Sequence, residues 1–169
     1  SNSTKMQLKR WVHCAEIMFE KALYDQADVL LKKAEKLALE IECNTIIFEI
    51  DQLRSKLIIA RSFEDVDEND IMLLKRKREQ TIEEMNKEIS YEQLNLSFLH
   101  NLRKSKILRS NAELEKNYHP IINHHLIVNE QEANSLKCKL IRNRLLGTYY
   151  SFISKPEESR YFIDQQIKV

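Results

Sequence analysis

Glycine and proline are almost missing from this chain, and their scarcity narrows its architecture more than any other property. Among 169 residues there is one glycine, Gly147, and there are two prolines, Pro120 and Pro156, where average usage is about 7% and about 5%. Phosphate-cradling loops, dinucleotide-binding turns and tight hairpins need several residues at positive φ or with bare backbone. The sequence therefore predicts a chain that is nearly all helix, and it excludes functions built on such loops.

The composition favours amphipathic helices in a reducing compartment. Hydrophobic residues make up 43% and charged residues 31% of the chain, which suits helices with one buried and one solvated face. The sequence has neither an apolar stretch of transmembrane length nor the pattern of a retained signal peptide. The three cysteines lie far apart, without a C-x-x-C pair, which is typical of a chain with no disulfide framework. We therefore expect a cytoplasmic protein that does not enter a membrane.

The first two residues and the residue usage suggest where the chain comes from. Ser1 and Asn2 read as the remnant of a cleaved expression tag, so residues 3–169 are taken as a single all-helical domain. High isoleucine, lysine and asparagine usage is typical of an AT-rich genome and indicates a bacterial source.

Apolar spacing predicts about seven helices. They span residues 4–23, 25–41, 44–63, 71–104, 111–118, 135–153 and 156–167. An acidic linker over 64–70 precedes the long fourth helix, which either runs unbroken or kinks near Ser90. Pro120 is expected to end the fifth helix, because proline disfavours helical geometry in the residue before it. Residues 119–128 are then irregular or form short turns.

Two segments of the chain repeat one helical-hairpin pattern. The first contains Trp11, Cys14, Ala15, Met18, Ala27, Leu31 and Ala34. The second contains Asn143, Leu146, Gly147, Tyr150, Ser159, Ile163 and Gln166. These spacings resemble the tetratricopeptide repeat (TPR), a helical hairpin of about 34 residues. The resemblance covers residues 8–41 and, with departures at its first and last positions, residues 140–168, whereas residues 71–128 give no such register.

The resemblance implies an irregular right-handed superhelix of stacked antiparallel hairpins. Small residues such as Ala15 and Gly147 let two helix backbones approach, and larger ones fill the space between them. In such arrays the first helix of each hairpin lines a concave groove. The candidate groove residues are Lys9, Val12, Glu16 and Phe19 in the first hairpin, and Arg144, Thr148, Ser151 and Phe152 in the last. The alternative for the aromatic members is ordinary packing against the next helix.

Family members that grip a terminal carboxylate use Lys, Asn and Arg at such groove positions. Val12 and Glu16 do not match that clamp, and only Arg144 suits it. The resemblance therefore does not predict an adaptor of the carboxylate-clamp type.

No catalytic, cofactor or metal site is expected. His13 and Cys14 are adjacent, as are His124 and His125, so the members of each pair point to different faces of a helix. No histidine or cysteine pair has the spacing of metal ligands. The cysteines are better explained as small core residues, Cys14 in particular. Enzyme function is disfavoured for the same reason.

Nucleic-acid binding is a weaker alternative. Residues 75–78 form a basic run, Lys-Arg-Lys-Arg, and residues 85–169 carry 13 Lys and Arg against 9 Asp and Glu. Four consecutive residues spread around the whole circumference of a helix, and Glu79 and Glu83 lie within pairing distance of them. The run is therefore interpreted as a solvated helix surface.

We interpret the chain as a non-catalytic interaction module that binds a peptide or a partner protein in a helical groove. Two alternatives remain open at this point. The chain is a fragment of a peptide-sensing transcription or signalling protein whose output domain is missing, or it forms a homodimer through the long helix over 71–102.

Overall fold

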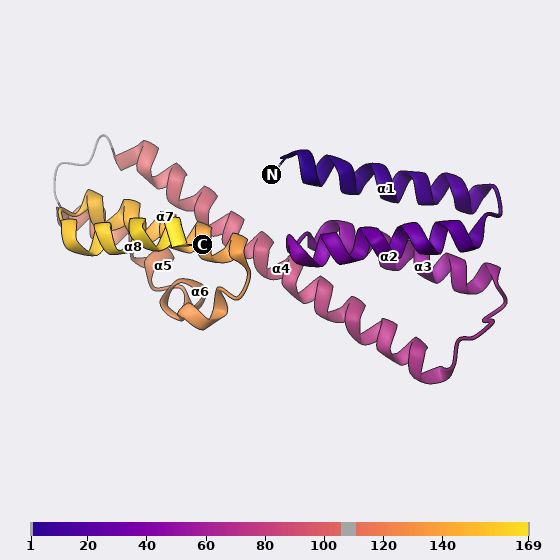
Figure 1. The fold of residues 1–169 in the computed structure, drawn as a ribbon. Helices are drawn as coiled ribbons and strands as arrows, with labels where there is room; N and C mark the ends of the chain where they lie inside the picture. The colour runs from indigo at the N-terminus through magenta and orange to yellow at the C-terminus, as the bar shows by residue number, and fades with distance from the viewer. Residues whose placement is uncertain (1, 106–110, 169) are drawn as a thin grey trace. The chain divides into compact units, whose positions relative to one another are not determined.

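The computed structural model describes residues 2–105 and 111–168, and within those ranges every regular element is a helix (Figure 1). The elements are α1 (Asn2–Glu20), α2 (Tyr24–Glu40), α3 (Asn44–Ala60), α4 (Glu68–Ser105), α5 (Asn111–Ile122), α6 (His125–Val128), the 3₁₀ helix η1 (Glu130–Glu132), α7 (Leu136–Phe152) and α8 (Pro156–Lys168). The prediction of an all-α fold is confirmed. Ser1 of the expected tag remnant lies outside the described residues. Across the described helices, none combines the length and apolarity that a membrane crossing requires.

The chain divides into two compact units inside α4. One unit runs up to Met85 and the other begins at Asn86, whereas the sequence was taken as one domain. Helix α4 is a single helix of 38 residues, so its first part belongs to unit 1 and its remainder to unit 2. It shows no break at Ser90, whose hydroxyl donates to the Asn86 carbonyl at 2.9 Å.

Helix α4 begins with reciprocal capping. The Asp70 amide donates to the Asp67 carboxylate at 2.8 Å, and the Asp67 amide donates to the Asp70 carboxylate at 3.1 Å. This is the geometry of a capping box. Two carboxylates at the positive end of the helix dipole also favour the helix, as expected for the end of the acidic linker.

Unit 1 packs α1, α2 and α3 side by side, joined by short turns (Figure 1). The small and apolar residues of the first hairpin pattern lie at the centre of this packing. Ala15, Ala27, Leu31 and Ala34 are all fully buried. The alanines of the pattern therefore lie in the close-packed core of this unit, where a larger side chain would need more room.

Cys14 does not belong to that core. It is exposed, whereas Cys43 and Cys138 are buried, so the expectation for Cys14 was wrong. At about 100° per residue, Cys14 lies about 120° around α1 from the fully buried Leu8. The core-facing stripe of α1 is occupied by Leu8, Val12 and Ala15 instead.

Four helices end in a left-handed residue that is not glycine. At the end of α1, Ala22 has φ 58°, its amide donates to the Phe19 carbonyl at 2.9 Å, and the Leu23 amide donates to the Met18 carbonyl at 2.9 Å. This pair of bonds is the Schellman motif, in which glycine is the preferred residue. The same motif ends α2, α3 and α7, with Glu42, Ser62 and Ser154 in the left-handed position. Gly147 itself lies inside α7.

Ala22→Gly is expected to raise the free energy of unfolding by about 0.5–1 kcal/mol, because glycine removes the steric cost of positive φ. Part of that gain is lost because glycine also increases the conformational entropy of the unfolded chain. Urea denaturation followed by circular dichroism measures the change. The matched control is Ala60→Gly at the exposed end of α3, where glycine replaces a helical residue and is expected to be destabilising. If the two substitutions changed the free energy of unfolding equally, the backbone at Ala22 would not be strained.

A cluster of charged side chains joins α2, α3 and the start of α4 within unit 1. Arg54 on α3 donates to both carboxylate oxygens of Glu35 on α2, at 2.7 and 3.2 Å. Lys77 on α4 forms an ion pair with Glu35. Arg78 donates to the Asp51 carbonyl at 3.0 Å and to the Ser55 hydroxyl at 2.7 Å. The first part of α4 is therefore fixed to α2 and α3 by charge-assisted hydrogen bonds.

Asp51 is the least satisfied member of this charged cluster. Its side chain is 0% exposed, and neither carboxylate oxygen accepts a hydrogen bond from the described residues. The Arg54 and Lys77 nitrogens each approach one oxygen only to 3.7 Å. Burial raises the pKa of the Asp51 carboxyl above its usual value, and the guanidinium groups of Arg54 and Arg78 oppose the rise only in part.

Because its folded-state pKa is raised, Asp51 stabilises the fold in its protonated form, and that stability is lost as pH rises through the folded-state pKa. Asp51→Asn is therefore expected to unfold at a higher urea concentration than the wild type near pH 7. The difference is expected to shrink as pH falls toward about 4. Glu49→Gln, an exposed position on the same helix, is the control and is expected to show no such trend. The prediction is contradicted if the wild type is more stable than Asp51→Asn and the difference in stability grows with pH.

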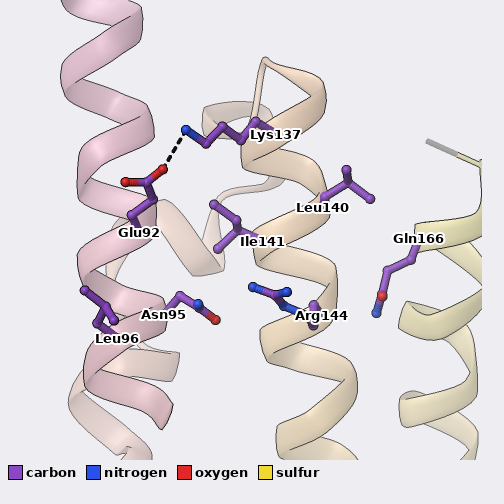
Figure 2. Close-up of a pocket in the computed structure, with 8 residues that line it drawn as sticks. All are labelled: Glu92, Asn95, Leu96, Lys137, Leu140, Ile141, Arg144 and Gln166. Atoms are coloured by element: carbon purple, nitrogen blue, oxygen red, sulfur yellow. Dashed lines mark ion pairs between the residues drawn. The ribbon is translucent and has the colours of Figure 1, made fainter. Parts of the chain in front are cut away.

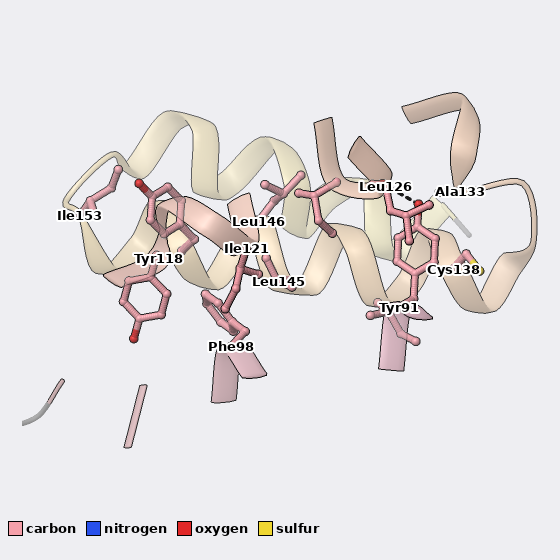
Figure 3. Packing of buried hydrophobic residues seen from close by; sticks show 13 residues of the cluster. Tyr91, Phe98, Tyr118, Ile121, Leu126, Ala133, Cys138, Leu145, Leu146 and Ile153 are labelled. Carbon is pink, nitrogen blue, oxygen red and sulfur yellow. Dashed lines mark hydrogen bonds between the residues drawn. The ribbon is translucent and has the colours of Figure 1, made fainter. Parts of the chain in front are cut away.

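Unit 2 is built around aromatic side chains from α4, α5 and α7 (Figure 3). Phe98 on α4 packs on Tyr118 of α5 with ring centroids 5.1 Å apart, and Tyr118 packs on Tyr149 of α7 at 5.9 Å. Tyr91 is fully buried, and its hydroxyl donates to the Leu126 carbonyl at 2.6 Å. Burial raises the pKa of Tyr91 to about 12, so this donor keeps its proton at neutral pH.

Helices α7 and α8 meet at the only glycine. A Cβ built on Gly147 would lie 3.4 Å from Ile163 Cγ1 and 3.6 Å from Phe162 Cβ. The Ser159 hydroxyl donates to the Gly147 carbonyl at 2.9 Å. The expectation that Gly147 lies where two helices touch is therefore confirmed.

The predicted end of the fifth helix was wrong. Helix α5 continues past Pro120 to Ile122, two residues beyond the proline. Proline removes one backbone donor, and in the last turn that loss costs a single hydrogen bond. Ser135 caps α7 by accepting from the Cys138 amide at 3.1 Å. Helix α7 begins at Leu136 and α8 at Pro156, within one residue of the predicted starts.

Candidate functional site

The structure separates the predicted residues of the first hairpin into exposed and buried pairs. Lys9 and Glu16 on α1 are exposed. Val12 was expected to face a ligand, but it is 5% exposed and packs in the core of unit 1. Phe19 is half-buried, with its ring 5.6 Å from that of Tyr24. Of the four predicted residues on this helix, only Lys9 and Glu16 are exposed.

The predicted residues of the last hairpin all lie on α7 and are mostly accessible. Arg144 and Ser151 are exposed, and Phe152 is 41% exposed. Thr148 is half-buried, and its hydroxyl donates to the Arg144 carbonyl at 2.8 Å. These four residues belong to unit 2 and the four on α1 to unit 1, so each set is a surface of its own unit.

Arg144 lines a groove between α4 and α7, which we call the α4–α7 groove (Figure 2). Its volume is about 550 Å³. The lining residues are Glu92, Asn95 and Leu96 from α4, Lys137, Leu140, Ile141 and Arg144 from α7, and Gln166 from α8. Ser151 lines a second hollow of about 580 Å³ at the turn between α7 and α8, where Ser159 is already bonded to Gly147.

Apolar side chains form the floor and the edges of the α4–α7 groove. Ile141 points into the space between the two helices (Figure 2) and is buried. Leu96 and Leu140 stand at the edges and are 65% and 42% exposed. Apolar surface left exposed around a hollow is typical of a binding site, because covering it releases free energy.

One end of the groove is electrically neutralised. Lys137 forms ion pairs with Glu92 at 2.6 Å and with Glu88 at 3.2 Å. Burial opposes the charge on Lys137, but the hydrogen bonds and charges of Glu92 and Glu88 outweigh it and raise the pKa of its ammonium group. Lys137 is therefore charged at neutral pH and has its partners within the protein.

The other end of the groove carries a cation without a partner in the described part of the chain. Arg144 points toward the space between α4 and α7, as does Asn95 (Figure 2). Among residues 3–104 and 116–167, whose side chains the structure describes, no carboxylate forms an ion pair with its guanidinium. A guanidinium presents five donors in a fixed planar fork that matches a carboxylate. The α4–α7 groove therefore combines an apolar floor with one directional donor group.

The histidines and cysteines do not gather into a metal centre in the part of the chain that the structure describes. Among the residues placed by the structure, no three His, Cys, Asp or Glu side chains could hold a metal ion. His124 Nδ1 accepts from the Leu126 amide at 3.3 Å, so this ring caps α6.

The basic run at the start of α4 is largely engaged within the fold. Lys77 and Arg78 take part in the charged cluster around Asp51, and Lys75 lies 3.8 Å from Glu79. The interpretation of the run as a solvated surface therefore holds for Lys75 and Arg76, which are exposed, and is wrong for Lys77 and Arg78, which are half-buried.

Sequence reasoning found Arg144 but missed most of the groove. The sequence did contain one signal of the groove, namely a second apolar stripe on α4. Tyr91 and Phe98 face the core, whereas Leu96 lies about 140° around the helix from Tyr91 at about 100° per residue. An apolar residue that far outside the core stripe indicates a second contact surface.

No family model, curated protein or solved structure matches this chain.

Proposed function

We propose that this protein is a non-catalytic, TPR-like interaction module that binds a segment of a partner protein in the α4–α7 groove. One observation carries the proposal. Exposed Leu96 and Leu140 flank a hollow in which Arg144 has no acidic partner among the described residues. Apolar contacts would supply affinity, and the guanidinium would supply selectivity.

The helical hairpins support this assignment. The close contact of Gly147 with α8 holds α7 firmly, and the aromatic core holds α4 against α5 and α7. A groove whose walls are fixed before binding loses little conformational entropy when a ligand enters.

The test is selection of linear peptides from a displayed random library on the full chain, followed by fluorescence anisotropy of the selected peptides. Binding is expected to fall about tenfold or more in Leu140→Asp, because a carboxylate placed at the groove edge must be desolvated. Val128→Asp, at an exposed apolar position outside the groove, is expected to bind as the wild type does.

Three results would overturn the proposal. Selected peptides that bind Leu140→Asp and the wild type equally would place the site elsewhere, and loss of binding in Lys9→Ala/Glu16→Ala would move it to α1. If no selected peptide binds the folded chain more tightly than it binds the unfolded chain, the proposed function is wrong.

A further inference from the structure

We propose that the ligand of the α4–α7 groove is an amphipathic helix of a partner protein, with an aspartate or glutamate placed against Arg144 one helical turn from its apolar contacts. The inference rests on the proposed function, and it adds the conformation of the ligand, its charge and the position of that charge.

The conformation follows from the walls of the groove. Both walls are helices, α4 and α7, whose interior backbone groups bond within their own helix. An extended peptide in this groove would find no row of backbone donors and acceptors, such as a sheet edge supplies. Its buried amide groups would remain without hydrogen-bond partners, and each unpaired group would weaken the binding. A helix satisfies its own backbone and offers only side chains to the groove.

The charge follows from the unequal ends of the groove. At one end Lys137 already has two acidic partners, Glu92 and Glu88. A ligand carboxylate placed there would meet Glu92, which is half exposed. At the other end Arg144 has no acidic partner among the described residues. A ligand acid is therefore favoured at the Arg144 end and disfavoured at the Lys137 end.

The spacing follows from the register of α7. Ile141 on the groove floor and Arg144 are three residues apart, so they are separated by about 4.5 Å along the helix at about 1.5 Å per residue. Side chains three or four residues apart on a ligand helix have the same separation. One ligand face can thus cover Ile141 with an apolar residue and reach Arg144 with a carboxylate.

The net charge of unit 2 also favours an acidic ligand. Residues 86–169 carry 13 Lys and Arg against 9 Asp and Glu. An excess of positive charge attracts an acidic ligand and raises its association rate at low salt.

The test uses a displayed library of helical peptides of about 18 residues, each with two fixed leucines one turn apart. Two positions are randomised, one turn from the leucines on either side, and both peptide ends are blocked so that no terminal carboxylate is present. The library is selected separately on the full-length wild type and on Arg144→Glu, whose helical content is checked by circular dichroism.

The expected result is enrichment of Asp and Glu at one randomised position on the wild type, with no acidic preference at the other. On Arg144→Glu the same position is expected to select Lys and Arg. Single peptides that carry Glu are expected to bind the wild type about tenfold more tightly than their Gln counterparts. That preference is expected to disappear in Arg144→Gln.

The failures of the two proposals are distinguishable. Enriched helices without an acidic preference, whose binding is lost in Leu140→Asp, would overturn the acidic helix and leave the proposed function standing. Selected linear peptides with no helical pattern would overturn the helical conformation only. Self-association of the wild type that is lost in Leu96→Asp, measured as mass in solution, would assign the groove to a second copy of this chain and overturn the partner helix.

Discussion

Arg54→Met is expected to lower the free energy of unfolding by about 3–5 kcal/mol near neutral pH, the usual cost of removing one partner from a buried ion pair. Arg54 is the bidentate partner of Glu35 and also lies 3.7 Å from Asp51. Methionine fills a similar volume, so the loss is mainly electrostatic. Two buried carboxylates would then share the single ammonium group of Lys77.

Urea denaturation of the variant and the wild type measures this loss, and its pH dependence identifies the cause. The loss is expected to become smaller as pH falls, because burial raises the pKa of Asp51 and the carboxyl takes up a proton at a higher pH than an ordinary aspartate does. The control is Lys32→Met, which removes an exposed ion pair with Asp28 on α2. Exposed pairs of this kind contribute about 0–1 kcal/mol. A loss in Arg54→Met that does not change with pH would assign the effect to packing.

Phe98→Ala is expected to destabilise unit 2 by about 3–5 kcal/mol, through lost burial and the cavity that remains. Phe98 is 1% exposed and lies at the centre of the aromatic core, against Tyr118. Tyr118 in turn packs on Tyr149, so the cavity would open beside two further rings. Aromatic pairs also contribute beyond their buried area.

Hydrogen exchange of the α7 amides, together with urea denaturation, measures the effect of Phe98→Ala. Its matched control is Phe152→Ala, the same substitution at an exposed position of the same unit, where a change of less than about 1 kcal/mol is expected. Similar losses at the two positions would show that Phe98 is not the centre of the core.

The all-helical fold and most helix positions could be predicted, because they depend on local properties. Few glycines and prolines, 3.6-residue apolar spacing and capping residues act within one or two turns of a helix. The starts of α7 and α8, at Leu136 and Pro156, were found in this way to within one residue. So was the contact of Gly147 with α8, since a lone glycine in a helix indicates close packing.

The errors arose where tertiary packing decides. Pro120 lies inside α5 because one lost hydrogen bond in a last turn is easily outweighed by packing, and its neighbours Tyr118 and Ile121 are buried. Val12 and Cys14 lie about 160° apart around α1 at about 100° per residue, so the rotation of the helix about its axis decides which of them faces the core. Spacing alone does not fix such a rotation.

The candidate site was less predictable than the fold. Arg144 was identified through the TPR-like register, but the groove also depends on α4, which lies outside both hairpin patterns. Helices α4 and α7 are joined through α5 by the ring contacts of Phe98 with Tyr118 and of Tyr118 with Tyr149, which connect residues far apart in the sequence. Local patterns carry no information about such pairings.

Because the three cysteines are buried to different extents, the reactivity of each thiol reports on the unfolding of this protein. Cys14 is exposed in the folded chain, whereas Cys43 is buried in unit 1 and Cys138 in unit 2. A short pulse of a thiol-specific reagent therefore modifies one sulfur in the native protein, and each of the other two only after its own unit opens. Mass spectrometry of the modified peptides along a urea series would follow the two units separately in one sample, without any engineered label.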